Sequence, residues 1–178
     1  MRLIFLYGPD GCGKTFVQKK LASKNTDIIF VSFEPSRFGQ PNGIIDTGNN
    51  GEFSAENPPT SILKSLMLSV RYTIRFLFLI LRTPKGSIVV CSRGPLEFGI
   101  NNTHRRIPSI LGRIINWMLG GESVLICRNI DSILVKKNEL SRDRIMELYE
   151  EYMKYCRVMV NNNSIDALDN SLNILLGI

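Results

Sequence analysis

Short apolar runs, each ended by turn residues, recur along the chain and predict about five strands. The run 2–7 is continuously apolar after Arg2 and stops at Gly8-Pro9. Such a run is typical of a parallel strand that is buried on both faces. We expect the other strands over residues 27–33, 87–91 and 123–127, with a short one near Val158 or near Ser164-Ile165.

Helical patterns separate these strands and define the fold class. Helices are predicted over residues 14–23, 62–82, 108–119, 141 to about 159, and 171–176. Strands that alternate with helices, without hairpin signals, indicate a parallel sheet covered on both faces. We therefore expect one α/β domain over residues 1–178, a three-layer αβα sandwich. Residues 40–59 are rich in Gly, Asn and Pro and predict a mobile loop near a site.

The helix 62–82 is apolar enough to raise the question of a membrane span. Lys64, Arg71 and Arg75 interrupt it, and each central charge costs about 2.5–3.5 kcal/mol on insertion scales. A buried helix is the better interpretation. The stretch 76–81 is nevertheless more apolar than one core-facing helix side requires, which allows packing against a second copy of the chain.

Composition limits the function classes. The chain has 178 residues and a net charge of +6, which suits a polyanionic ligand. Without a basic run interleaved with aromatic residues, we expect no nucleic-acid partner. Four cysteines lie far apart in the sequence, as expected of free thiols in a reducing compartment. The apolar start is too short for a signal peptide, so we expect a cytoplasmic protein.

The strongest motif follows the first strand. Gly8-Pro9-Asp10-Gly11-Cys12-Gly13-Lys14-Thr15 has the P-loop pattern Gly-x-x-x-x-Gly-Lys-Thr. Its glycines let backbone N–H groups turn toward phosphate oxygens, and the following helix directs its positive end to the same place. Lys14 would reach the β- and γ-phosphates of ATP, and the Thr15 hydroxyl would bind Mg²⁺. We expect the nucleotide to contact Gly8, Asp10, Gly11, Cys12, Gly13, Lys14, Thr15 and Phe16.

The sequence resembles the thymidylate kinase-like nucleoside-monophosphate kinases over almost its whole length. The loop fits that group's Gly-x-Asp-Gly-x-Gly-Lys pattern, with Asp10 as the acidic residue. The resemblance implies that Asp10 lies near the substrate sugar or a metal-bound water. The alternative is an aspartate favoured only for its turn propensity. A GTPase is disfavoured, because the sequence lacks an Asn-Lys-x-Asp motif.

Glu34-Pro35, at the end of the second predicted strand, resembles the group's Arg-Glu-Pro motif. In that motif the Arg holds the acceptor phosphate, but Phe33 stands at its position here and Arg37 comes three residues after Glu34. Either Arg37 binds the phosphate or the acceptor differs. Deoxynucleoside kinases place a catalytic Glu at this strand end, so Glu34 is also a candidate general base. A simple strand-end turn is the remaining alternative.

Two arginines match positions that bind the acceptor in the family. Arg71 precedes Arg93 by 22 positions, similar to the spacing between the base-reading Arg and the Arg of the group's Asp-Arg-Tyr/His motif. Arg93 would clamp phosphate through its guanidinium. Ser92 replaces the Asp and Gly94 the aromatic residue, so Ser92 would support Mg²⁺ only through a bound water. An Arg71 paired with a surface acid is the alternative to ligand binding.

A lid segment over residues 128–144 also resembles the family. Lys136 and Lys137 follow Asp131 at the spacing of the family's acidic residue and Arg-Lys pair, and Lys136 would close over the transferred phosphoryl group. Arg142 and Arg144 are either lid cations or charges on a solvated helix. By the same resemblance, a homodimer would pack through the helix 62–82.

Three functions follow from these residues. The first is an ATP-dependent kinase that phosphorylates a nucleoside monophosphate such as thymidylate, with the acceptor-side loop at residues 36–60. The second keeps the reaction but uses a nucleoside, sugar or glycolipid hydroxyl as acceptor, with Glu34 or Asp10 as base. The third is a nucleotide-binding protein with little turnover, for which Ser92 is the reason.

Overall fold

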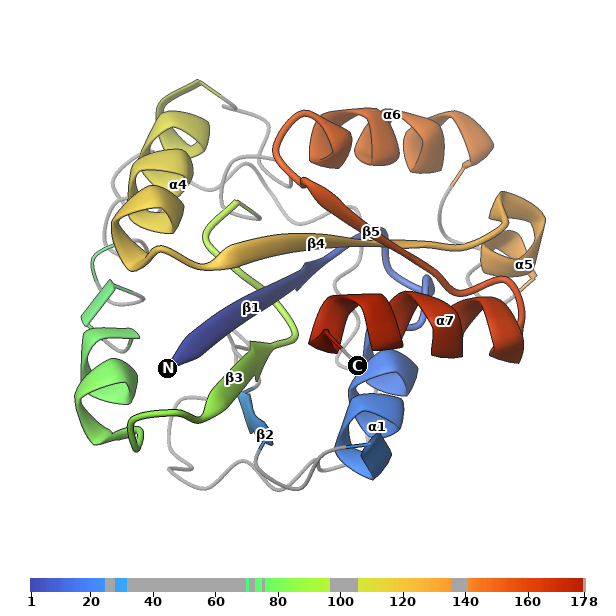
Figure 1. Ribbon diagram of the computed structural model, residues 1–178. Helices are drawn as coiled ribbons and strands as arrows, with labels where there is room; N and C mark the ends of the chain where they lie inside the picture. Colours follow the sequence, from blue (N-terminus) through green and yellow to red (C-terminus); the bar gives the residue numbers. More distant parts are fainter. Residues whose placement is uncertain are drawn as a thin grey trace.

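The computed structural model describes residues 1–24, 28–31, 70, 73–74, 76–96, 106–135 and 141–177, with backbone alone at 106–109 and 111. Strands and helices alternate along the chain (Figure 1). Their bounds are β1 Arg2–Tyr7, α1 Lys14–Lys24, β2 Ile28–Val31, β3 Ile88–Cys91, α4 Arg106–Leu119, β4 Glu122–Cys127, α5 Ile130–Leu134, α6 Arg142–Met153, β5 Val158–Asn161 and α7 Ile165–Leu176.

The five strands form one parallel sheet in the order β2-β3-β1-β4-β5. This confirms the predicted α/β fold, and the fifth strand is the one expected near Val158. On one side of β1 lie β3 and then β2, and on the other side lie β4 and then β5. The carboxyl end of β1 therefore lies where the strand order reverses, which is the usual ligand site of such sheets.

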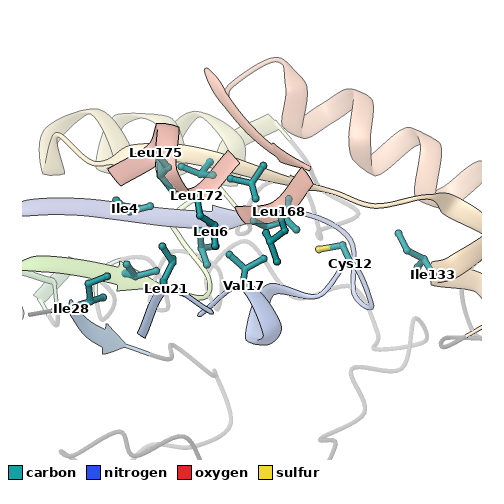
Figure 2. Close-up of a cluster of buried hydrophobic side chains, with 14 of the residues drawn as sticks. Ile4, Leu6, Cys12, Val17, Leu21, Ile28, Ile133, Leu168, Leu172 and Leu175 are labelled. Carbon is teal, nitrogen blue, oxygen red and sulfur yellow. The ribbon is translucent and has the colours of Figure 1, made fainter. Parts of the chain in front are cut away.

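Two apolar layers cover the sheet, because alternate strand residues point to opposite faces. On one face, Ile4 and Leu6 of β1 are fully buried against side chains of α1 and α7. Figure 2 shows Val17 and Leu21 of α1 and three leucines of α7 gathered around them. On the other face, Phe5 and Tyr7 pack with Phe76, Leu148 and Tyr152. The result is a three-layer αβα sandwich.

Three helices differ most from the sequence prediction, while the ends of α1 and α4 lie within two residues of it. The helix α7 begins at Ile165, because the Ser164 hydroxyl accepts a hydrogen bond from the Ala167 N–H at 3.2 Å. The helix α6 ends at Met153, six residues earlier than expected, which leaves room for β5. The five-residue helix α5, capped by the side chain of Asn129, was not predicted.

The described part of the predicted helix 62–82 is helical at residues 70, 73–74 and 76–82. It ends where the N–H of Thr83 donates to the carbonyl of Leu79 at 3.0 Å. In the part of the chain that the structure describes, every helix falls short of the length and apolarity that a membrane crossing requires.

Candidate nucleotide site

The P-loop leaves the carboxyl end of the central strand β1, and its backbone requires glycine at three positions. Gly8, Gly11 and Gly13 have φ values of 142°, 89° and 96°, which L side chains rarely adopt. Space is restricted as well. A Cβ on Gly8 would lie 2.8 Å from Cys12 Sγ, and a Cβ on Gly13 would overlap the side-chain amide of Asn162. The backbone path of the loop therefore explains why glycine stands at these positions.

Lys14 lies across this loop as the first residue of α1. Its Nζ donates to the carbonyl oxygens of Gly8 at 2.6 Å and Pro9 at 3.3 Å. The first intrahelical bond joins the N–H of Val17 to the carbonyl of Gly13 at 3.0 Å. The preceding N–H groups of the first turn have no intrahelical acceptor, as in any α-helix. Together with the helix dipole and the Lys14 ammonium, they make this position suited to an anion.

Asp10 connects the loop to the end of β3. Its Oδ1 lies 3.6 Å from Lys14 Nζ and 3.7 Å from Arg93 Nη2. Arg93 reaches this place because β3 pairs in parallel with β1, with Cys91 opposite Phe5, so that both strands end at the same level. Three residues predicted from the sequence therefore meet here, two cations and one carboxylate. Ser92, between Cys91 and Arg93, donates its N–H to the carbonyl of Val31 at 3.1 Å.

Asn162 is a site residue that the sequence analysis missed. It follows β5, is 9% exposed, and its Nδ2 donates to the carbonyl of Cys12 at 2.8 Å. Its backbone N–H donates to the carbonyl of Cys127 at 2.8 Å. Asn162 thus fixes the loop to the ends of β4 and β5. The available signal was its position, one residue beyond a strand at the carboxyl edge of the sheet.

Arg128 is a second site residue that was not predicted. Its Nη1 lies 3.8 Å from the position that a Cβ on Gly13 would take, which places the guanidinium beside the P-loop. The Tyr149 hydroxyl accepts from the Arg128 N–H at 3.0 Å and donates to the Arg128 carbonyl at 3.2 Å. Burial raises the pKa of Tyr149, so this phenol keeps the proton it donates. Arg128 adds a third cation near the loop.

The packing around Tyr7 explains the glycine after Arg93. The Tyr7 hydroxyl donates to Asn116 Oδ1 at 3.2 Å and accepts from the Leu96 N–H at 3.4 Å. A Cβ on Gly94 would overlap that hydroxyl. An aromatic side chain at position 94, as in the Asp-Arg-Tyr/His motif, has no room while Tyr7 occupies this space.

Several predicted site residues lie outside the described residues, namely Glu34, Arg37, Arg71, Lys136 and Lys137. Of the neighbouring charges, Arg142 pairs with Asp131 at 3.2 Å and Arg144 with Glu147 at 2.6 Å. The first pair is exposed and the second is half-buried, and exposed pairs contribute little to stability. The lid role of residues 128–144 stays a prediction.

The four cysteines are free, with Cys12 and Cys91 buried and Cys127 and Cys156 half-buried. Burial raises the pKa of Cys91 and Cys127, and it raises that of Cys156 to about 12. Cys91, Cys127 and Cys156 therefore stay protonated near neutral pH and are poor nucleophiles. They serve packing in the sheet and its helices.

A Mg²⁺ ion fits this donor set only as part of a metal–nucleotide complex. Among the described residues, no group of three His, Cys, Asp or Glu side chains is arranged to hold a metal. Mg²⁺ usually keeps several waters and takes few protein ligands when phosphates share it. The Thr15 hydroxyl at the start of α1 is suited to that role, and Ser92 lies at the end of the neighbouring strand.

Comparisons with known proteins give structural neighbours only. No family model matches the sequence, and no curated protein matches it. Among solved structures, the thymidylate kinase of Candida albicans aligns with 99% of this chain and 91% of its own, at 13% identity and a TM-score of 0.63. Shikimate kinase from Acinetobacter baumannii, in complex with shikimate, covers 99% of this chain and 94% of its own (16% identity, TM-score 0.53).

A third neighbour is the YorR protein of Bacillus subtilis in complex with phosphorylated GDP. It covers 98% of this chain and 95% of its own, at 16% identity and a TM-score of 0.55. These alignments span 98–99% of the chain, and they confirm that its fold is that of the thymidylate kinase-like P-loop kinases.

Proposed function

We propose that the protein is an ATP-dependent kinase that transfers the γ-phosphoryl group to a nucleoside monophosphate such as thymidylate. The observation that carries the proposal is the meeting of Asp10, Lys14 and Arg93 at the P-loop, with Asp10 Oδ1 3.6 Å and 3.7 Å from the two cations. Phosphoryl transfer depends mainly on positioning and on neutralising phosphate charge. This cluster supplies two cations at the place where the loop would hold the phosphates.

The roles of the individual groups follow from their positions. The loop amides and the first turn of α1 would bind the nucleotide phosphates, and Lys14 would exchange the Gly8 and Pro9 carbonyls for phosphate oxygens. Mg²⁺, held by the Thr15 hydroxyl, would neutralise charge on the transferred group. Arg93 would contact both donor and acceptor phosphates, and Asp10, which lies beside Arg93 and Lys14, would orient these two cations.

The acceptor is the finer part of the proposal. Thymidylate kinase and shikimate kinase are both structural neighbours, and their names indicate different acceptors, so the fold leaves this choice open. Arg71 and Arg37 are the candidate acceptor-binding residues, and Lys136 is the candidate lid cation.

A hydroxyl acceptor is the second candidate, because Phe33 stands where an acceptor-phosphate Arg is expected. In that case Glu34 is the candidate base, since Asp10 already lies between two cations. Nucleotide binding with little turnover is the third candidate, and it rests on Ser92, whose hydroxyl brings no negative charge to a metal. Replacing Ser92→Asp tests this third candidate, because a large gain in rate would mean that the native site lacks a working carboxylate.

The deciding experiment is an acceptor screen with γ-labelled ATP and Mg²⁺. Thymidylate and other nucleoside monophosphates form one group, and nucleosides and sugars form the other. Strong labelling of thymidylate supports the leading proposal and contradicts a hydroxyl acceptor. Labelling confined to nucleosides or sugars reverses that conclusion. Tight ATP binding without transfer to any acceptor supports the third candidate.

A further inference from the structure

Two arginines approach the P-loop from opposite sides of β1. Arg93 follows β3, which pairs with β1 on one side, and Arg128 follows β4, which pairs with β1 on the other side. Leu125 lies opposite Tyr7, the last residue of β1, so Arg128 stands three residues beyond the level at which β1 ends. Figure 1 shows α5, which begins two residues after Arg128, at the same edge of the sheet as the P-loop. The loop is therefore flanked by one arginine on each side.

The surroundings of Gly13 show from where Arg128 reaches the loop. A Cβ on Gly13 would overlap the amide of Asn162 and would lie 3.8 Å from Arg128 Nη1. Because Asn162 follows β5 and Arg128 follows β4, both groups approach the loop from the side of these two strands. The carboxylate of Asp10 instead lies beside Arg93, which follows β3.

The balance of charge differs between these two sides of the loop. Lys14 and Arg93 share the Asp10 carboxylate, at 3.6 Å and 3.7 Å. Within the described residues, the half-buried guanidinium of Arg128 has neither a hydrogen bond nor an ion pair, and Asp131, the nearest acid in the sequence, pairs elsewhere. A cation that gives up water without gaining an anion is costly. The β4 side of the loop thus lacks a negative charge that a ligand can supply.

The backbone of Arg128 is held by a tyrosine of α6. The Tyr149 hydroxyl accepts a hydrogen bond from the Arg128 N–H at 3.0 Å and donates one to the Arg128 carbonyl at 3.2 Å. One hydroxyl thus binds both main-chain groups of the first residue after β4. The Tyr149 ring packs against side chains of both apolar layers, which keeps the hydroxyl in place. Tyr149 therefore fixes the point from which the Arg128 side chain extends to the loop.

We propose that Arg128 binds the α- and β-phosphates of the nucleotide from the β4 side, and that Tyr149 is its positioning residue. The inference rests on the proposed function, because it adds a ligand-binding group to the same nucleotide site. Lys14 and Arg93 occupy the Asp10 side, where the γ-phosphate and the acceptor are expected. Arg128 is left for the phosphates that the loop amides hold. Its guanidinium can donate two parallel hydrogen bonds to a phosphate, which would supply the missing negative charge.

Calorimetry with ATP and with ADP, each in the presence of Mg²⁺, tests this contact. Arg128→Gln should weaken the binding of both nucleotides about tenfold or more, since hydrogen bonds to a charged group are lost. Arg128→Lys should lose less, because it keeps the charge but not the planar fork. The control is Arg157→Gln, which removes an exposed guanidinium just before β5, at the opposite edge of the sheet. The control should bind both nucleotides like the native protein.

The outcomes separate this inference from the kinase proposal. Equal ATP affinities in Arg128→Gln and Arg157→Gln would overturn the inference and leave the kinase proposal intact. A loss for ATP but not for ADP would overturn it as well, since the contact would then be to the γ-phosphate. If the native protein binds ATP but transfers phosphate to no acceptor, the kinase proposal fails. A loss of ATP and ADP binding that is confined to Arg128→Gln would still support the inference in that case.

A double-mutant cycle on ATP affinity tests the role of Tyr149. Tyr149→Phe keeps the ring but releases the Arg128 backbone, and it should weaken ATP binding about threefold to tenfold. In the Arg128→Gln background, the same change should have no further effect. Tyr155→Phe, which removes the hydroxyl of a half-buried tyrosine after α6, should bind ATP like the native protein. Equal losses from Tyr149→Phe in both backgrounds would mean that Tyr149 does not act through Arg128, and would overturn its positioning role.

Discussion

The side-chain amide of Asn162 donates a hydrogen bond to the carbonyl of Cys12, although 150 positions separate the two residues in the sequence. This 2.8 Å contact joins the end of β5 to the middle of the P-loop. Because Asn162 is buried, the Cys12 carbonyl has little access to water as a substitute. The loop conformation thus depends on a residue in a different part of the chain.

Replacing Asn162→Ala should therefore destabilise the loop. An unsatisfied buried carbonyl costs about 1–3 kcal/mol, which corresponds to a melting temperature lower by roughly 2–12 °C at this chain length. We also expect weaker ATP binding by calorimetry. The control is Asn170→Ala, an exposed asparagine on α7. If both variants bind ATP like the native protein, the loop does not need this hydrogen bond.

Gly13 and Gly86 form a matched pair for separating backbone strain from steric overlap. Their φ values are 96° and 97°, but a Cβ on Gly13 would overlap the Asn162 amide, whereas a Cβ on Gly86 meets nothing within 4 Å. Both alanine variants should lose stability, by about 1–2 kcal/mol from the left-handed conformation. Only Gly13→Ala should abolish ATP binding. Equal ATP affinities in the two variants would contradict the role given to this contact.

Tyr7 and Gly94 should be energetically coupled. Gly94→Ala places a methyl group where the Tyr7 hydroxyl lies, and overpacking of this kind costs about 1–3 kcal/mol. In the double variant Tyr7→Phe with Gly94→Ala, the hydroxyl is gone and part of the loss should be recovered. A double-mutant cycle on the free energy of unfolding measures this coupling. Purely additive effects would contradict the packing explanation for Gly94.

The raised pKa of Cys156 leads us to expect a loss of stability at alkaline pH. Its pKa is raised from 9.0 to about 12 by burial, so the folded state keeps the proton after the unfolded state has released it. The contribution of the protonated Cys156 thiol to the free energy of unfolding is fully present below pH 9 and is lost as the pH rises toward 12. In this pH window, the free energy of unfolding measured in urea should fall more steeply with pH for the native protein than for Cys156→Ala. Parallel curves would contradict the assigned burial.

Much of the fold was predictable because it is encoded locally. The strand β1 was predicted with the bounds it has, since its apolar run ends at the first glycine of the loop. The start of α7 was predicted six residues too late. Asp166, Asp169 and Asn170 interrupt the apolar pattern, so the sequence does not indicate that Leu168 is buried. The helix α5 has only five residues, too few to show a helical period.

The candidate site was predictable only where a motif carries it. Asp10, Lys14 and Arg93 were found from the P-loop and from the resemblance to thymidylate kinases. Asn162 and Arg128 were not, because they reach the loop through strand pairing across the sheet. A single asparagine or arginine carries no local signal of such a contact.

Transfer of labelled γ-phosphate from ATP to thymidylate, compared between the native protein and Lys14→Met, tests the kinase proposal most directly. We expect turnover by the native protein and a loss of at least about 100-fold in Lys14→Met, since removing a positioned charge-stabilising donor commonly costs this much. The variant should remain folded by thermal melting. Equal ATP binding and equal turnover in the two proteins would contradict the account.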